Sequence, residues 1–375
     1  MEVEHLKNEI QRTELIEFGW TASWDQKWED VMSTFNHAEK ETLRPARITT
    51  DYGQKYGILT AEGNKFGSLS GKARALFSEG SKPGVGDWVI VKTYGDYDDA
   101  LIHGVLERNS VISRQAAGFE TKEQIIAANV DTLFIVCALN GDYNSRRLER
   151  YLIMAWNSGV NPVIVLSKSD LCEDLSSYLT ETEAIAPGVP VIPVSAHYGL
   201  GKEALEVYTG SGKTVALVGS SGSGKSTMIN WLTGESHQMT QEVREEDSRG
   251  RHTTTHREMF RLPEGGILID TPGMRALSIW DDGEGISRTF EDIEQLAQQC
   301  RFSDCQHLQE VGCAVRDAIQ TGELEAKRLE NYHKMLREIQ FQVKKEAVAA
   351  KKSTRNTKHS TTRDKKSGWR KEIED

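Results

Sequence analysis

Residues 219–227 read Gly-Ser-Ser-Gly-Ser-Gly-Lys-Ser-Thr, and no other stretch constrains the chain so strongly. The stretch matches G-x-x-x-x-G-K-[ST] at every fixed position, a pattern typical of a loop whose backbone amides surround phosphate groups. The apolar run 214–218 before it predicts a buried strand, and 228–232 after it continues as a helix, which is the context that the motif requires. The sequence therefore predicts a nucleoside triphosphate site in an α/β domain.

The residues of this loop have expected roles at the triphosphate. Its glycines let the backbone turn N–H groups inward, and the helix that follows points its positive end at the phosphates. Lys225 is expected to reach the outer phosphates and stabilise their charge during hydrolysis, while Ser226 offers its hydroxyl to Mg²⁺. The predicted phosphate-binding residues are Gly219, Ser220, Ser221, Gly222, Ser223, Gly224, Lys225, Ser226 and Thr227.

A second motif, Ser167-Lys168-Ser169-Asp170, follows an apolar strand predicted at 162–166 and indicates which base is bound. The Asp170 carboxylate can accept hydrogen bonds from the N1–H and the exocyclic amine of guanine. Adenine has an acceptor at N1 and no amine at C2, so it would leave that carboxylate unpaired at a high cost. Lys168 is expected to lie along the base plane. An ATP-dependent kinase or ATPase on the same loop is therefore disfavoured, and competition between GTP and ATP would test it.

Strands and helices alternate around these motifs. Apolar strands are predicted at 133–139 and 189–194, with a helix at 145–157, and this alternation is typical of a parallel sheet with helices on its faces. Ser195-Ala196 follows the last of these strands and is expected to contact the guanine carbonyl.

Two further segments are expected to respond to the γ-phosphate. Residues 251–255, Arg-His-Thr-Thr-Thr, lie in a polar stretch and predict a mobile loop, from which one threonine, assigned here to Thr254, binds Mg²⁺. A strand predicted at 266–269 ends in Asp270-Thr271-Pro272-Gly273. Asp270 is expected to hold the Mg²⁺ shell, and the Gly273 amide to sense the γ-phosphate.

The residue that orients the attacking water is less clear from the sequence. Met274 stands where many GTPases carry a glutamine, and a thioether is too weak an acceptor to position water. His252 in the threonine loop is the hypothesis for this catalytic role. A contact with RNA or a packing role is the alternative for His252.

Composition limits the class of protein. The chain has 375 residues, enough for two or three domains, and no run of about 18 apolar residues, so a soluble cytoplasmic protein with no membrane contact is expected. Five cysteines are too few for a disulfide framework. The net charge is −10, yet eleven Lys or Arg lie in 344–371, so an acidic body ends in a basic tail that either stays solvated or contacts rRNA.

The first 110 residues predict a barrel with an extension before it. Five short β-rich pieces separated by glycine turns lie between 44 and 106, the strand count of an OB-fold barrel, which often binds oligonucleotides. A purely structural barrel is the alternative, since its basic residues are scattered. In the acidic extension, Trp20, Trp24 and Trp28 repeat every four residues, and we expect this face to pack on the next domain rather than on a partner. The scattered basic residues are Arg44, Arg47, Lys55, Lys65, Lys72, Arg74 and Lys82.

A cluster near the end of the chain predicts a metal centre. Cys300, Cys305, His307 and Cys313 supply three thiols and one imidazole within 14 residues, a ligand set suited to a closed, tetrahedral, structural Zn²⁺ site. Cys137 in an apolar strand and Cys172 just after residues 167–170 are expected to be ordinary buried thiols.

The order of the motifs points to a family. Ordinary GTPases begin with the phosphate loop and finish with the base-reading motifs, whereas here 167–170 and 195–196 come first, so the domain is circularly permuted. With a barrel in front, the run Ala-Ala-Asn-Val-Asp at 127–131 and a Cys/His cluster behind, the chain over about 44–340 resembles the ribosome small subunit-dependent GTPase A family, known as RsgA or YjeQ. The resemblance implies GTP hydrolysis stimulated by the small ribosomal subunit and a role late in its maturation. Ser167, where GTPases usually carry asparagine, and the tryptophan-bearing extension depart from the pattern.

The predicted fold class is α/β: a circularly permuted P-loop GTPase domain between an N-terminal OB-fold barrel and a C-terminal zinc-binding helical domain. We expect a monomer that binds GTP and GDP, Mg²⁺, one Zn²⁺, and the small ribosomal subunit through its rRNA. A nucleotide-gated RNA-binding adaptor with little turnover is the alternative function. The expected domains are the extension 1–43, the barrel 44–110, the GTP-binding domain 111–282, the zinc-binding domain 283–345 and the basic tail 346–375.

Substituting Asp170→Asn tests the assignment of the base. The new amide should weaken binding of GTP and admit xanthosine triphosphate, because its N–H can donate to the C2 carbonyl of xanthine. Competition binding with GTP, xanthosine triphosphate and ATP measures this change. An unaltered GTP affinity would show that Asp170 does not read the base.

Overall fold

The computed structural model describes residues 15–77, 82–94, 97–115, 123–235, 257–271, 284–341, 343, 344 and 348. The chain forms two compact units. Among the described residues, those up to 114, those between 123 and 271 and those of 284–289 belong to the first unit, while Gln115 and the residues from Phe290 onward belong to the second.

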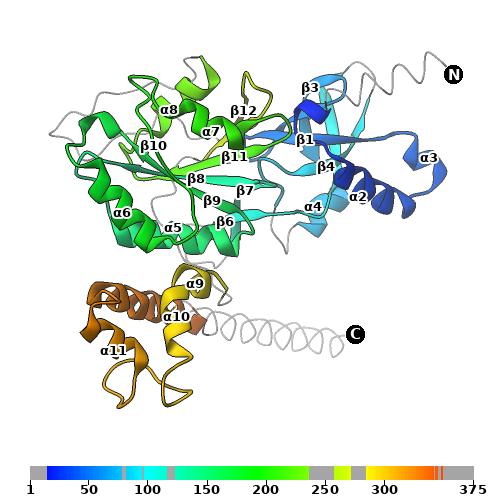
Figure 1. Cartoon of the computed structure of the whole chain (residues 1–375). Helices are drawn as coiled ribbons and strands as arrows, with labels where there is room; N and C mark the ends of the chain where they lie inside the picture. Colours follow the sequence, from blue (N-terminus) through cyan, green and yellow to red (C-terminus); the bar gives the residue numbers. More distant parts are fainter. Residues whose placement is uncertain are drawn as a thin grey trace, which may run out of the picture. The chain divides into compact units, whose positions relative to one another are not determined.

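The first unit is built on an eleven-stranded sheet in the order β10-β9-β8-β11-β13-β12-β1-β2-β3-β5-β4 (Figure 1). The strands from β10 to β13 in this order are parallel to one another, and β12 joins them antiparallel to β13. Every residue of β8, β11 and β13 is buried, as expected for strands covered on both faces. These six strands are β8 (Thr132–Ala138), β9 (Asn161–Ser167), β10 (Val191–Pro193), β11 (Thr214–Gly219), β12 (Glu258–Arg261) and β13 (Ile267–Asp270).

A helix follows each of the first four parallel strands along the chain. Figure 1 shows α5 and α6 on one face of the sheet and α7 and α8 on the other, the doubly wound arrangement that the alternating pattern predicts. The carboxyl ends of these strands therefore lie at one edge of the sheet, where α/β proteins bind ligands. The helices are α5 (Ser145–Asn157), α6 (Leu175–Ile185), α7 (Lys202–Thr209) and α8 (Lys225–Thr233).

The other five strands close into a barrel, as predicted from the five β-rich pieces. β1 pairs with both β2 and β4, β2 with β3, and β3 runs parallel to β5, which pairs with β4. This closed order, with a short helix α4 (Gly71–Leu76) between β3 and β4, is that of an OB-fold. The barrel strands are β1 (Leu43–Asp51), β2 (Tyr56–Thr60), β3 (Gly63–Leu69), β4 (Trp88–Thr93) and β5 (Asp99–Val105).

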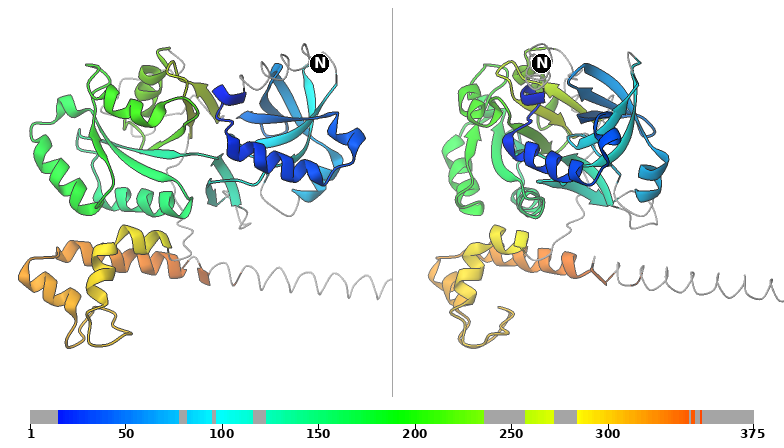
Figure 2. Two further views of the ribbon diagram at one scale, coloured as in Figure 1. Left: turned by 45° about the vertical axis from the view of Figure 1, so that its right-hand side comes forward. Right: turned by 90° about the vertical axis from the view of Figure 1, so that its right-hand side faces the viewer.

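The tryptophan-bearing extension packs on the barrel, which confirms the expectation from its spacing. Helix α2 (Ala22–Ser33) is followed by the single turn α3 (His37–Lys40), and both lie beside the barrel (Figure 2). Trp20 and Trp24 are buried, and the Trp20 ring meets the ring of Trp88 edge-on at 4.7 Å between centroids. Trp28 is only partly buried.

Arg47, one of the scattered basic residues of the barrel segment, joins the barrel to the parallel sheet. Its side chain is buried. Burial is tolerated because its N–H donors are hydrogen-bonded to acceptors from four separate segments. Nε donates to the Gly86 carbonyl at 3.2 Å, one terminal nitrogen donates to the Phe18 carbonyl, and the other donates to the Asn129 carbonyl at 3.3 Å and to the Thr214 hydroxyl at 3.0 Å. Burial lowers the pKa of Arg47 to about 10, so the group stays charged at neutral pH.

The run 127–131, which resembles the family pattern, also contributes to the junction around Arg47 between the barrel and the parallel sheet. The side-chain amide of Asn129 donates through its nitrogen to the Gly86 carbonyl at 3.1 Å, and its oxygen accepts a hydrogen bond from the backbone N–H of Asn109 at 2.9 Å. Asp131 accepts the Thr214 amide at 2.7 Å. Gly86 has a φ of 94°, and a Cβ there would lie 2.1 Å from the Ala128 carbonyl oxygen, so only glycine fits. A separate hairpin-like pair, β6 (Val111–Gln115) and β7 (Glu123–Ala128), leads into this run.

The last helix of the first unit, α9 (Glu284–Thr289), packs on α5. The Arg288 guanidinium lies 4.6 Å from the centre of the Trp156 ring. Gly285 approaches α5 so closely that a Cβ would lie 2.1 Å from the Asn157 side-chain oxygen. The next residue along the chain, Phe290, belongs to the second unit.

The second unit is helical. It contains α10 (Glu291–Ala297), α11 (Ala314–Thr321) and a helical stretch from 326 to 341. Arg328 donates two hydrogen bonds of 3.0 Å to Asp292 and stacks over Phe290. Within the described part of the chain, every helix is too short or too polar to span a lipid bilayer.

Truncating Arg47 should destabilise the first unit. Arg47→Ala leaves the Phe18, Gly86 and Asn129 carbonyls without this buried donor, and we expect the free energy of unfolding to fall by about 3 kcal/mol. Chemical denaturation measures it. Arg44→Ala, an exposed arginine on the same strand, is the control and should change it by less than about 0.5 kcal/mol. Equal effects of the two substitutions would contradict the role assigned to Arg47.

Candidate nucleotide site and metal centre

The phosphate loop lies between β11 and α8, at the carboxyl edge of the parallel sheet. Gly224 precedes the helix with a φ of 91°, a conformation that favours glycine. The first turn of α8 therefore points its free N–H groups into the space above the loop, where they can bind an anion.

Lys225 lies folded against this loop. Its ammonium donates to the Gly219 carbonyl at 2.8 Å and to the Ser220 carbonyl at 2.6 Å. Both acceptors belong to the loop that is predicted to surround the triphosphate. The ammonium therefore lies at the loop, where the sequence predicts it to act.

Ser167 connects the base-reading motif to the phosphate loop. Its side chain is buried at the end of β9, and its hydroxyl donates to the Ser223 carbonyl at 2.6 Å. The Cys137 carbonyl on β8 lies 3.4 Å from the same hydroxyl. The serine that stands in place of the usual asparagine therefore still braces the loop. Its hydrogen bond comes from the buried end of β9, on the side of the loop where no ligand is expected.

The two base-reading motifs also lie together. Lys168 adopts a left-handed φ of 57°, which turns the chain so that the Ser169 amide donates to the Val194 carbonyl at 3.1 Å. Ser195 is buried and exchanges two backbone hydrogen bonds with Leu200. Asp170 is exposed, so its carboxylate is accessible to a ligand, and Ala196 is partly exposed.

Asp270 ends β13 beside the strand that leads into the loop. It pairs in register with Leu217, and its side chain is 5% exposed. The Thr271 hydroxyl donates to the Leu217 carbonyl and so ties the residue after Asp270 to β11. Three of the predicted functional residues, His252, Thr254 and Gly273, lie outside the described residues, and their roles stay predictions.

The four predicted metal ligands converge in the second unit. The Cys300 Sγ lies 3.6 Å from the His307 Nδ1 and 3.9 Å from the Cys313 Sγ, while His307 Nδ1 and Cys313 Sγ lie 3.4 Å apart. Together with Cys305, all four ligand atoms fall within 4.8 Å of one another. Two sulfurs bound at about 2.3 Å to a tetrahedral ion lie about 3.8 Å apart, so the cluster fits such an ion.

Glu310, which the sequence analysis did not single out, holds the loop that presents His307. Its carboxylate accepts the amides of Gln306, Leu308 and Gln309 at 2.8–3.0 Å. Hydrogen bonding from its own backbone amide, together with these three bonds, lowers the pKa of Glu310 to about 2. They fix a turn in which His307 has a positive φ of 59°. Cys137 is buried in its strand as expected, and burial raises its pKa to about 12. The expectation that Cys172 is also buried is wrong, because it lies just beyond the end of β9 and is partly exposed.

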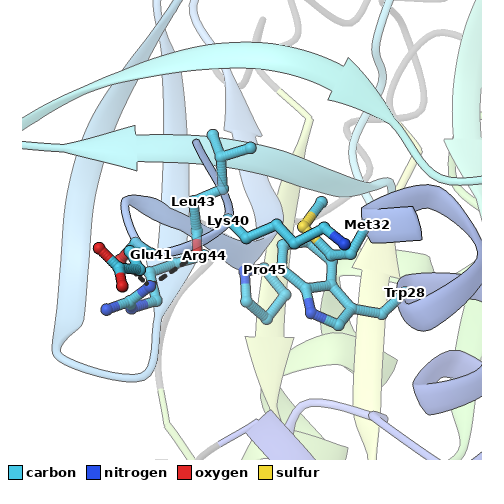
Figure 3. Close-up of a pocket in the computed structure, with 7 residues that line it drawn as sticks. All are labelled: Trp28, Met32, Lys40, Glu41, Leu43, Arg44 and Pro45. Carbon is cyan, nitrogen blue, oxygen red and sulfur yellow. Dashed lines mark hydrogen bonds between the residues drawn. The ribbon is translucent and has the colours of Figure 1, made fainter. Parts of the chain in front are cut away.

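A shallow groove of about 490 Å³ lies between the extension and the barrel (Figure 3). Trp28 and Met32 of α2 line it together with Pro45 of β1, and Lys40 lies across it (Figure 3). The Arg44 guanidinium at its edge donates to the Glu41 carbonyl at 2.9 Å. The groove accounts for the partial exposure of Trp28.

Comparison with known proteins agrees with this geometry. The model of the RsgA GTPase family matches residues 105–280. A small ribosomal subunit biogenesis GTPase RsgA of Syntrophotalea carbinolica is 40% identical over 367 residues, covering 96% of this chain and 98% of the relative. RsgA 1 of Oceanobacillus iheyensis is 45% identical over 298 residues, covering 79% and 85%. The chain belongs to the RsgA GTPase family. It is therefore a GTP-hydrolysing enzyme.

Solved structures of the family share the fold. The crystal structure of YjeQ from Thermotoga maritima superposes with a TM-score of 0.59 at 27% identity, covering 79% of this chain and 98% of that one. YloQ, a circularly permuted GTPase, superposes with a TM-score of 0.57 at 24% identity, covering 82% and 99%. The predicted fold class is confirmed: a circularly permuted GTPase sheet, an OB-like barrel before it and a Cys₃His cluster after it.

Substituting Ser167→Ala should loosen the phosphate loop. Losing one buried hydrogen bond costs about 1 kcal/mol, so we expect the dissociation constants of GTP and GDP to rise together by about fivefold. Ser169→Ala is the control, because Ser169 acts through its backbone amide. Nucleotide titration with both variants measures the change. Equal nucleotide affinities for the Ser167 variant and its parent would show that the Ser167 hydroxyl does not hold the phosphate loop for binding.

Proposed function

We propose that this RsgA-family chain is a ribosome-biogenesis GTPase whose hydrolysis is stimulated by the small ribosomal subunit, late in the maturation of that subunit. The observation that carries the proposal is the joining of the nucleotide motifs: Ser167 bonds to the phosphate loop and Ser169 to the strand before Ser195. The names of the relatives, small ribosomal subunit biogenesis GTPases, support the choice of partner.

In the proposed site, GTP occupies the carboxyl edge of the sheet. Asp170 and Lys168 hold guanine with help from the turn at Ser195-Ala196, and residues 219–227 hold the phosphates. Mg²⁺ is bound by Ser226, by Thr254 and through the shell held by Asp270. The buried position of Asp270 beside Leu217 is consistent with this role, because its carboxylate lies one strand away from the loop.

Contact with rRNA is proposed through the barrel and the basic tail. The closed OB-like strand order supports the first, and the eleven Lys or Arg in 344–371 support the second, since clustered cations release counterions from phosphates. Arg47 is excluded from this surface by its burial. We expect the protein to act in the cytoplasm as a monomer.

The proposal is tested by measuring GTP turnover alone, with small subunits and with large subunits. Stimulation by small subunits only is expected, because the catalytic glutamine is replaced by Met274 and the isolated protein has little to orient water. Turnover that is fast alone, or indifferent to small subunits, would overturn the choice of partner. Tight GTP binding with negligible stimulated turnover would favour the RNA-binding adaptor.

Zinc is the proposed metal of the Cys₃His cluster. We expect one Zn²⁺ per chain, held by Cys300, Cys305, His307 and Cys313, because three thiolates and an imidazole leave no position open. Elemental analysis of protein purified without chelator measures it. Cys313→Ser should lose the metal, while Cys172→Ser should keep it. Less than about half an equivalent in the parent would contradict a structural site.

His252 is the proposed positioner of the attacking water. His252→Ala should lower subunit-stimulated turnover by about tenfold or more and leave the affinities for GTP and for the small subunit intact. Single-turnover hydrolysis on the subunit measures this effect. Unchanged stimulated turnover would remove His252 from the mechanism.

A further inference from the structure

Asp142 and Arg147 meet the phosphate loop from a segment that none of the nucleotide motifs includes. They lie in and just after the loop that follows β8. Because β8 pairs in parallel with β11, with Val136 opposite Gly219, the segments that leave the two strands emerge side by side. The Ser220 hydroxyl donates to one oxygen of the Asp142 carboxylate.

Arg147 is fixed against the same carboxylate. Its guanidinium donates to the other Asp142 side-chain oxygen at 2.9 Å and also to the Asp142 backbone carbonyl. The Arg147 amide in turn donates to the Asn144 side chain at 3.0 Å, which caps the start of α5. About a third of each charged side chain is exposed, at 34% for Arg147 and 36% for Asp142.

Ser220 is thus held at two points. Its hydroxyl is bound to Asp142, and its carbonyl accepts the Lys225 ammonium. If Lys225 moves to the phosphates when GTP binds, the carbonyl loses that donor, and the Asp142 contact is left to hold the first turn of the loop. A carboxylate is a strong acceptor for this purpose, but it also places a negative charge next to a triphosphate site.

We propose that Asp142 and Arg147 form a charge-balanced positioning pair for GTP: Asp142 holds the phosphate loop through Ser220, and Arg147 cancels the charge that would otherwise repel the γ-phosphate. The pair rests on the nucleotide site proposed above and adds two residues to it. It gives Ser220 a carboxylate acceptor without adding net negative charge beside the phosphates.

The proposal predicts a pattern of GTP and GDP affinities that a general loss of protein stability in the variants would not produce. Arg147→Ala leaves Asp142 uncompensated, so it should raise the dissociation constant of GTP by about three- to tenfold and that of GDP by less, since GTP carries more negative charge. At about 1 M salt, where the screening length falls to about 3 Å, the effect should shrink. Asp142→Asn keeps an oxygen acceptor and removes the charge, so GTP should bind at least as tightly as to the parent.

The decisive variant is the double substitution Asp142→Asn with Arg147→Ala. Removing both charges should restore the ratio of GTP to GDP affinity to within about twofold of the parent. If the two substitutions only damaged the structure independently, their losses in affinity would add and the double variant would bind worse than either single variant. Lys213→Ala is the control, because it removes one positive charge from an exposed position at the other end of β11.

Titrations of GTP and GDP with the full chain and these four variants decide the matter. Rescue by the double substitution together with the salt dependence supports the pair. A GTP to GDP ratio for Arg147→Ala equal to that of Lys213→Ala, or a double variant no better than Arg147→Ala, overturns it. Failure of the parent itself to bind GTP would instead reject the nucleotide site.

Discussion

The parallel pairing of β9, β8 and β11 is the constraint on which the rest of the site depends. Parallel strands end at the same edge, so the segments that follow them converge whatever their order along the chain. Circular permutation changes which segment comes first and leaves this edge unchanged. That is why 167–170, which precedes the phosphate loop by about fifty residues, can still touch it through a single buried hydroxyl.

The junction around Arg47 sets a second constraint, the attachment of the barrel to this sheet. A buried guanidinium loses its hydration, and it is tolerated because acceptors from the extension, the barrel, 127–131 and β11 replace water around it. Asp131 and Asp87 add favourable charge nearby, against the burial that lowers the pKa of the group. Thr214, one of those acceptors, begins the strand that ends at the phosphate loop. The barrel is therefore fixed to the strand that carries the nucleotide motif.

Local patterns in the sequence predicted most of the elements. The helix expected at 145–157 has those bounds in the structure, because Asn144 caps it and its apolar residues repeat on one face. The five barrel strands and the four metal ligands were found for the same reason, since turn residues and ligand spacing are local signals. The burial of Trp20 and Trp24 followed from their spacing alone.

Contacts between distant segments could not be predicted in this way. The sequence marked Arg47 only as one of several scattered basic residues, because arginine is rarely buried and the acceptors of Arg47 come from positions up to 167 residues away. Asp142 was not singled out because its partner Ser220 is 78 residues further along, and only the order of the strands brings them together. The roles of Asn129 and Glu310 likewise depend on backbone groups that a sequence pattern does not display.

Ser167, which stands where GTPases usually carry asparagine, shows how contacts from two different strands together hold the phosphate loop. A hydroxyl has a single proton, and the 2.6 Å distance to the Ser223 carbonyl indicates that this proton is used there rather than at Cys137. An asparagine amide has two protons and could serve both carbonyls. The serine therefore holds the loop at one point, from the β9 side, and Asp142 holds it at Ser220, from the β8 side. Neither contact involves Lys225, so the movement of Lys225 to the phosphates that we propose would leave both side-chain anchors of the loop in place.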